Sequence, residues 1–198
     1  MLKTNSKRQN MQRYKCIVII GPPGSGKSTI AKIISKNKKF FAIDMGKMAR
    51  QLQKEKLLDP IISDSITKGI PLNPKLNYKL VYDTINNYIK DGSFNPKRQI
   101  IISGGNFGTA ENAKMLKMLL EMIQIIVLDI PDELLVNRIE KQHIEQKRND
   151  NKESIIYQRI LSYRKNMSSI LAEFKPQIIT HVDASLPLTK VTKIVKES

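Results

Sequence analysis

A glycine-rich run near the N-terminus combines the residue types that bind polyphosphates. It fits the pattern G-x-x-x-x-G-K-[ST] and reads Gly21-Pro22-Pro23-Gly24-Ser25-Gly26-Lys27-Ser28-Thr29. Glycines allow backbone N–H groups to turn inward around phosphate oxygens. Lys27 can reach the terminal phosphates of a nucleoside triphosphate, and the Ser28 hydroxyl can bind Mg²⁺. The run therefore predicts a binding site for ATP and Mg²⁺.

The residues on either side of this run predict the elements that must position it. Residues 16–20 form an apolar segment that is typical of a buried parallel strand. After the run, apolar side chains recur at helical spacing, at Ile30, Ala31, Ile33 and Ile34. A helix that begins at the end of the loop would direct the positive end of its dipole toward the same anion. Strand, loop and helix together support the phosphate-binding interpretation.

Short apolar runs alternate with helical patterns along the rest of the chain, which predicts an α/β fold. Such alternation is typical of a parallel sheet covered by helices on both faces, that is, a three-layer α/β/α architecture. Ligands of such a sheet gather at the carboxyl ends of its strands, where the glycine-rich run lies. The five expected strands are residues 15–20, 40–43, 99–103, 124–129 and 177–183.

Two stretches are too long for single crossover helices and predict added substructures. About 55 residues separate the second and third expected strands and include several prolines and glycines, so they should form two or three short helices that make a lobe. Residues 133–146 and 153–174 are predicted to be two helices joined by a polar stretch. We expect one domain over residues 14–198, preceded at 1–13 by a disordered basic tail that carries no acidic residue.

Composition narrows the class of protein. The chain has 198 residues, enough for one core, and no apolar run approaches the roughly 20 residues of a membrane span. Its net charge of +16 would attract polyanions, but nucleic acid is disfavoured as a partner because lysines are spread throughout and no aromatic-rich RNA-binding motif is present. A single cysteine cannot form an internal disulfide, which favours a reducing, cytoplasmic location.

Several segments, in order along the chain, resemble motifs of the adenylate kinase group of nucleoside monophosphate kinases. The glycine-rich run resembles G-x-P-G-S-G-K, and the segment from Val127 to Arg138 resembles V-L-x-V-P-[DE]-E-x-L-x-x-R. The likeness covers nearly the whole chain beyond the tail. Met45-Gly46-Lys47-Met48-Ala49-Arg50 is similar to T-G-D-x-[LM]-R, and Gly69-Ile70-Pro71-Leu72-Asn73-Pro74 loosely resembles G-x-[LV]-V-P. Arg148-Asn149-Asp150 with Arg159 resembles R-x-D-D…R, and Val182-Asp183-Ala184-Ser185 resembles V-D-A-S.

This resemblance implies a P-loop kinase fold with a five-stranded parallel sheet, an inserted lobe at 45–75 that binds a nucleoside monophosphate, and a short lid at 139–152. It implies that a monomer transfers the γ-phosphoryl group of Mg-ATP to a nucleoside monophosphate, with AMP as the first choice. The catalytic residues would be Lys27, Arg138, Arg148 and Arg159. The residues that bind the monophosphate would be Met45, Gly46, Lys47, Arg50, Leu72, Gly105 and Asn112.

The sequence departs from the family where residues 104–113 stand in place of D-G-[FY]-P-R-T-x-x-Q-A. Gly104 replaces the acid that organises water around Mg²⁺, Gly108 replaces an arginine that grips the acceptor phosphate, and Asn112 replaces a base-reading glutamine. An active-site arginine can be worth a factor of about 10³–10⁵ in rate. Three alternatives therefore stay open: an active or weak kinase, a catalytically inactive ATP-binding regulatory protein of the same fold, and an RNA-associated NTPase suggested only by the net charge.

Overall fold

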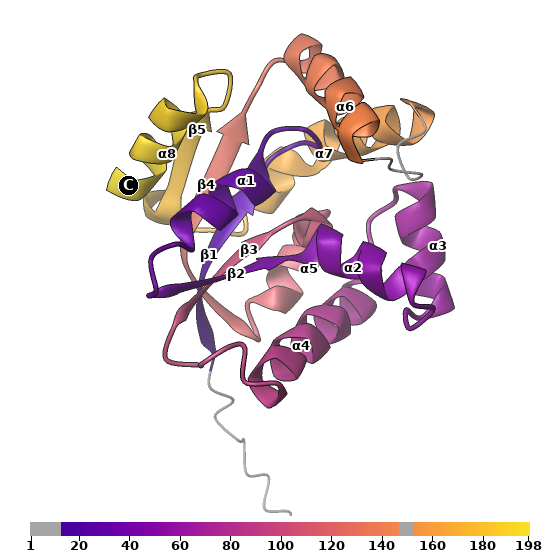
Figure 1. Cartoon of the computed structure of the whole chain (residues 1–198), viewed down its shortest axis with the longest axis vertical. Coiled ribbons are helices and arrows are strands. Elements are labelled where there is room, and N and C mark those ends of the chain that lie inside the picture. Colours follow the sequence, from indigo (N-terminus) through magenta and orange to yellow (C-terminus); the bar gives the residue numbers. More distant parts are fainter. Residues whose placement is uncertain (1–12, 147–152) are drawn as a thin grey trace, which may run out of the picture.

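A sheet of five parallel strands forms the centre of the computed structural model, which describes residues 13–146 and 153–198. The strand order is β2-β3-β1-β4-β5, and every adjacent pair is parallel (Figure 1). The α/β fold predicted from the sequence is therefore confirmed. The strands are β1 (Tyr14–Ile20), β2 (Phe40–Asp44), β3 (Gln99–Ser103), β4 (Leu120–Asp129) and β5 (Ile179–Asp183).

Strand β4 is longer than predicted: it begins at Leu120, whereas we expected it to begin at residue 124. Glu121 interrupts the apolar run and is exposed, but Leu120 is buried and pairs with Tyr14 of β1. The tail predicted at 1–13 lies outside the described residues except for its last residue, and so does the 147–152 part of the predicted lid.

Helices cover both faces of the sheet and so complete three layers (Figure 1). One face packs against α1 and α8, and the other packs against α4 and α5, while α7 contributes Ile160 to the first core and Ile170 to the second. Helix α6 joins the first face through its buried apolar side chains. The bounds of these helices are α1 (Lys27–Ile34), α4 (Pro74–Lys90), α5 (Ala110–Leu116), α6 (Asp132–Gln146), α7 (Glu153–Leu171) and α8 (Leu188–Glu197).

The central strands are buried on both faces because their sequences are nearly continuous apolar runs. In β3, Ile100 and Ile102 pack on the side of α4, whereas Ile101 packs on the side of α1, and all three are fully buried. Burying each such side chain contributes about 1.5–3 kcal/mol to stability. The strands therefore form a rigid base from which the loops at their carboxyl ends emerge.

The connection from β2 to β3 contains two short helices, α2 (Met45–Lys54) and α3 (Pro60–Lys68), followed by the longer α4. Each helix begins at a side chain whose oxygen accepts a backbone N–H: Asp44 for α2 at 2.9 Å, Asp59 for α3 at 2.8 Å and Asn73 for α4 at 3.0 Å. Helix α4 has 17 residues, more than the short helices that we predicted, because its apolar face packs into the core on the sheet.

A reciprocal pair of buried hydrogen bonds joins α4 to the loop after β3. Asn77 Nδ2 donates to the backbone carbonyl of Asn106 at 2.8 Å, and Asn106 Nδ2 donates to Asn77 Oδ1 at 2.8 Å. Both side chains are buried, and Asn106 lies in the short 3₁₀ helix η1 (Gly105–Phe107). Because buried polar groups are costly when unpaired, this pair fixes the position of the loop.

We predict that Asn77→Ala lowers the free energy of unfolding by about 2–4 kcal/mol, because it leaves the Asn106 amide and carbonyl buried without their partner. Urea unfolding followed by circular dichroism measures this change. Asn87→Ala is the matched control, since Asn87 is an exposed residue of the same helix. Equal effects of the two substitutions would contradict the structural role of the pair.

Candidate functional site

The glycine-rich run forms a loop at the carboxyl end of the central strand β1 and leads into α1. Gly26 caps α1 with a φ of 93°, and Gly24 has a φ of 79°, in the left-handed region that favours glycine. A Cβ on Gly24 would lie 2.8 Å from Ile139 Cγ1 of α6, whereas one on Gly26 would meet nothing within 4 Å. The loop is therefore packed against α6 on one side and open on the other.

The ammonium group of Lys27 is held inside this loop. Lys27 Nζ donates to the carbonyl oxygens of Gly21 at 2.7 Å and Pro22 at 2.6 Å. Burial lowers the pKa of Lys27 to about 8, and the nearby Asp44 carboxylate partly opposes this shift. An anion that enters the loop would find a cation already positioned.

A cavity of about 380 Å³ opens in front of the loop. It is bounded by the loop, the first turn of α2, the segment after α3, the segment after β3, and α7. Its size falls in the range of small-molecule sites. Lys27, Arg50 and Arg159 bring positive charge to it from three different helices, and Asp44 is the one acidic residue that lines it within the described part of the chain.

Part of the cavity lining is apolar. Leu72 and Phe107 form it together with Tyr163, whose pKa is raised to about 12 by burial and by the Asp129 carboxylate, so its hydroxyl stays neutral. A flat, largely apolar ligand group would fit against these side chains, while a charged group would lie toward Lys27.

The two arginines of the cavity are each held close to a glycine. A Cβ on Gly46 would lie 3.3 Å from Arg50 Nη1, so the guanidinium lies against the first turn of α2. Arg159 Nη2 donates to the backbone carbonyl of Ile66 at 2.8 Å, and a Cβ on Gly69 would lie 3.1 Å from Arg159 Nε. Arg159 therefore joins α7 to the last turn of α3.

Most residues that the sequence assigned to the site are brought together, and several are not. Gly21, Pro23, Gly24, Gly26, Lys27, Ser28 and Thr29 line the cavity, as do Met45, Gly46, Arg50, Leu72 and Arg159. Pro22 and Ser25 are buried behind the loop surface. Lys47 is exposed on α2 and Arg138 lies partly buried on α6, and neither of these two lines the cavity. Gly105 begins η1. Arg148 lies outside the described residues.

Asn112 supports the wall of the cavity without lining it. It is buried, and its Nδ2 donates to the Leu72 carbonyl at 3.0 Å. One of its two amide hydrogens is therefore already used by the protein. The side chain fixes the segment after α3 against α5.

The sequence interpretation missed Asp44 and the reason for Gly104. Gly104 has a φ of 128°, and a Cβ there would lie 3.1 Å from the backbone nitrogen of Gly46 and 3.2 Å from Met45 Cβ. An acidic side chain at this position would therefore be crowded by the start of α2 and strained by the positive φ. An acid directly after the second apolar run was a usable signal for Asp44, because that run ends at the same edge of the sheet as the glycine-rich loop.

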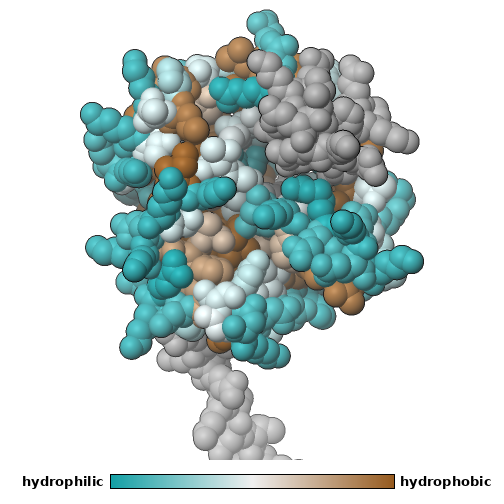
Figure 2. Space-filling model, in the orientation of Figure 1, coloured by the Kyte–Doolittle hydropathy of each residue, from teal (hydrophilic) through white to brown (hydrophobic). Residues whose placement is uncertain are grey.

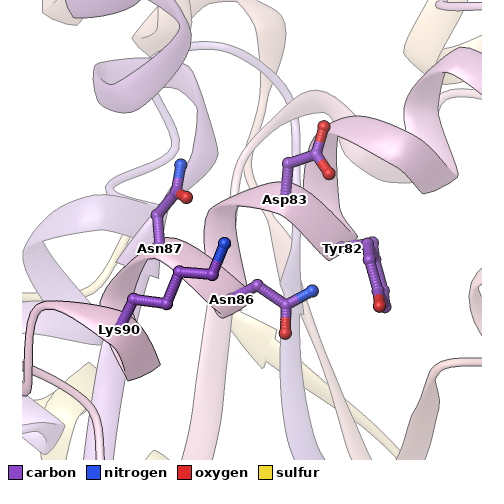
Figure 3. Close-up of a pocket in the computed structure, with 5 residues that line it drawn as sticks. All are labelled: Tyr82, Asp83, Asn86, Asn87 and Lys90. Atoms are coloured by element: carbon purple, nitrogen blue, oxygen red, sulfur yellow. The ribbon is translucent and has the colours of Figure 1, made fainter.

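A second hollow, of about 490 Å³, lies on the outer side of α4 and is a weaker candidate. Its lining residues are Tyr82, Asp83, Asn86, Asn87 and Lys90. All belong to one helix, and their side chains fan out from it (Figure 3). Because no other element of the described chain contributes a residue, these groups cannot surround a ligand.

Comparison with known proteins gives a consistent result. A family model described as an AAA domain matches residues 20–156. The chain is 25% identical over 189 residues to an adenylate kinase of Prochlorococcus marinus, covering 92% of this chain and 97% of the relative. It is 28% identical over 210 residues to an adenylate kinase of Borrelia duttonii, covering 91% and 95%. It is 26% identical over 202 residues to one of Leptospira biflexa, covering 93% and 99%.

Among the described residues, none of the helices is both long and apolar enough to cross a bilayer. Hydrophilic side chains cover most of the face shown in Figure 2, and apolar ones gather near its centre.

We predict that ATP binding at pH 8.5 is accompanied by net proton uptake, amounting on average to less than one proton for each ATP bound. Lys27 is largely deprotonated there in the free protein, since its pKa is about 8, and bound phosphate would raise that pKa. Calorimetry in two buffers of different ionisation enthalpy measures the uptake, which should fall toward zero at pH 6.8. Lys32→Met, on the exposed face of α1, is the control and should leave the uptake unchanged. Binding without uptake at pH 8.5 would contradict the lowered pKa.

Proposed function

This chain belongs to the AAA domain family and has the P-loop fold of the adenylate kinase family, and on this premise we propose that it transfers the γ-phosphoryl group of Mg-ATP to a nucleoside monophosphate, with AMP as the first choice. The observation that carries the proposal is the convergence of Lys27, Arg50 and Arg159 on one cavity from three separate helices. Phosphoryl transfer depends on holding two anionic substrates in line and neutralising their charge.

The donor triphosphate would lie in the loop around Lys27. Inward backbone N–H groups and the N-terminus of α1 would hold its outer phosphates. Ser28 is exposed in the first turn of α1 and lines the cavity, so its hydroxyl fits a Mg²⁺ bound to those phosphates. Hard oxygen donors are what Mg²⁺ prefers, and when bound it would neutralise phosphate charge.

The acceptor monophosphate would lie on the opposite side of the cavity. Arg50 is positioned for its phosphate, and the apolar wall at Leu72 and Phe107 is suited to a flat base. Asn112 holds the Leu72 carbonyl and so supports this wall from behind, and direct recognition of the base by Asn112 stays a prediction. Met45 and Gly46 would complete this side, and Lys47 and Gly105 stay predictions.

Closure would bring the remaining cations to the transferred group. We expect Arg148 to act from the predicted lid at 139–152, and Arg138 and Arg159 to act from the flanking helices α6 and α7. A closed lid would also exclude water, which otherwise accepts the phosphoryl group. The enzyme would work as a cytoplasmic monomer.

The inactive regulatory protein stays a second candidate because of a specific observation. Gly108 lines the cavity and brings no charge to it, so the acceptor phosphate would rely on Arg50 for its grip on that side. An RNA-associated NTPase is supported by the net charge of +16 alone.

The test is to mix the protein with Mg-ATP and each nucleoside monophosphate in turn and to follow diphosphate formation. We expect formation with one monophosphate, and we expect Lys27→Ala to reduce it by at least about a hundredfold through loss of charge stabilisation. Lys32→Ala is the matched control. ATP binding without diphosphate would favour the regulatory protein, and stimulation of hydrolysis by RNA would favour the RNA-associated NTPase.

We further predict that Gly108→Arg raises kcat/KM for AMP by about tenfold or more, because a second guanidinium would grip the acceptor phosphate. The backbone accepts this change, since Gly108 has a φ of −80° and a ψ of −20°. Gly108→Gln, of similar length and without charge, should give no gain. If the two variants behave alike, the acceptor phosphate does not lie beside this loop.

A further inference from the structure

The cavity lacks an acid at the end of β3 but has one at the end of the neighbouring strand. The first turn of α2 would crowd a side chain at Gly104, with the Gly46 nitrogen 3.1 Å from the position of a Cβ. Asp44, the residue just before that turn, lines the cavity together with Lys27 and Ser28. We propose that Asp44 is the carboxylate that positions the water ligands of nucleotide-bound Mg²⁺ in this protein. This inference rests on the proposed binding of Mg-ATP and specifies how that site is completed.

The register of the sheet places Asp44 on the correct face. Asp44 of β2 pairs with Ser103 of β3, and Ser103 pairs with Ile19 of β1. Paired residues on adjacent parallel strands project to the same face of the sheet. Ile19 packs in the core on the side of α1, so the row that contains Asp44 faces the helix that carries Lys27 and Ser28.

Ser103 gives an independent sign that a polar ligand belongs beside Asp44. Its side chain is fully buried, and its hydroxyl is without a hydrogen-bond partner among the described residues. A buried hydroxyl of this kind is costly unless water or a ligand satisfies it. It lies on β3, between the strand that leads into the loop and the strand that ends at Asp44, directly before the cavity-lining Gly104 in the chain.

Asp44 is also held in a fixed position. Its Oδ1 accepts the backbone N–H of Lys47 at 2.9 Å, which ties the carboxylate to the start of α2. The described residues contain no cluster of three metal-ligating side chains, so one carboxylate and one hydroxyl cannot retain Mg²⁺ without the nucleotide. Affinity for ATP and for Mg²⁺ should therefore depend on each other through Asp44.

The experiment compares Asp44→Asn with the unaltered protein in calorimetric titrations of ATP, once with excess Mg²⁺ and once with EDTA. Asparagine keeps an oxygen that can accept the Lys47 N–H, so α2 stays capped. We expect the gain in ATP affinity that Mg²⁺ gives to fall by about tenfold to a hundredfold. Affinity in EDTA should be unchanged or higher, because a negative charge near the triphosphate is removed.

Asp59→Asn is the matched control, because Asp59 caps α3 in the same way and does not line the cavity. It should leave both affinities unchanged. Equal weakening of ATP binding with and without Mg²⁺ in Asp44→Asn would overturn the inference and would show that Asp44 acts only on Lys27. An unchanged Mg²⁺ effect with lost phosphoryl transfer would also overturn it. Failure of the unaltered protein to bind ATP would instead refute the proposed function.

Discussion

The site depends on a cation that is held by the backbone before any ligand arrives. Lys27 donates to the carbonyls of Gly21 and Pro22, and this places its ammonium at the carboxyl end of the central strand. The loop can take that shape because glycines occupy its left-handed positions and because α6 packs directly against Gly24. The ammonium is partly desolvated in this arrangement, so its pKa falls. A bound phosphate would favour the charged form of Lys27 and raise this pKa again.

The register of strands β2 and β3 determines where an acidic group can lie near Lys27. Gly104 follows β3, where the start of α2 would crowd a side chain and the positive φ favours glycine, and the end of β2 carries an acid that caps the same helix. The close approach of one helix thus disfavours a carboxylate after one strand and fixes a carboxylate on the next. The acidic group stays on the same edge of the sheet although it belongs to a different strand.

The sequence was sufficient for features that depend on local pattern. Apolar runs located the strands, and the spacing of glycines, Lys27 and Ser28 located the loop. Features that depend on contacts between distant segments were not accessible. Nothing in the chain near Gly104 reveals that Gly46 lies 3.1 Å from where its Cβ would be. The bond from Arg159 to the Ile66 carbonyl likewise joins segments that the sequence separates widely, and its existence depends on how α7 packs beside α3.

That last bond has an energetic consequence for how the protein would respond to an acceptor. Arg159 is already engaged with a carbonyl at the end of α3, where the helix dipole favours positive charge. This bond uses one of the five N–H groups of the guanidinium, so capture of an anion does not require the carbonyl contact to break. Arg159 would then connect the α3 segment to a bound anion through a single planar group, and the position of that segment would be coupled to occupancy of the cavity.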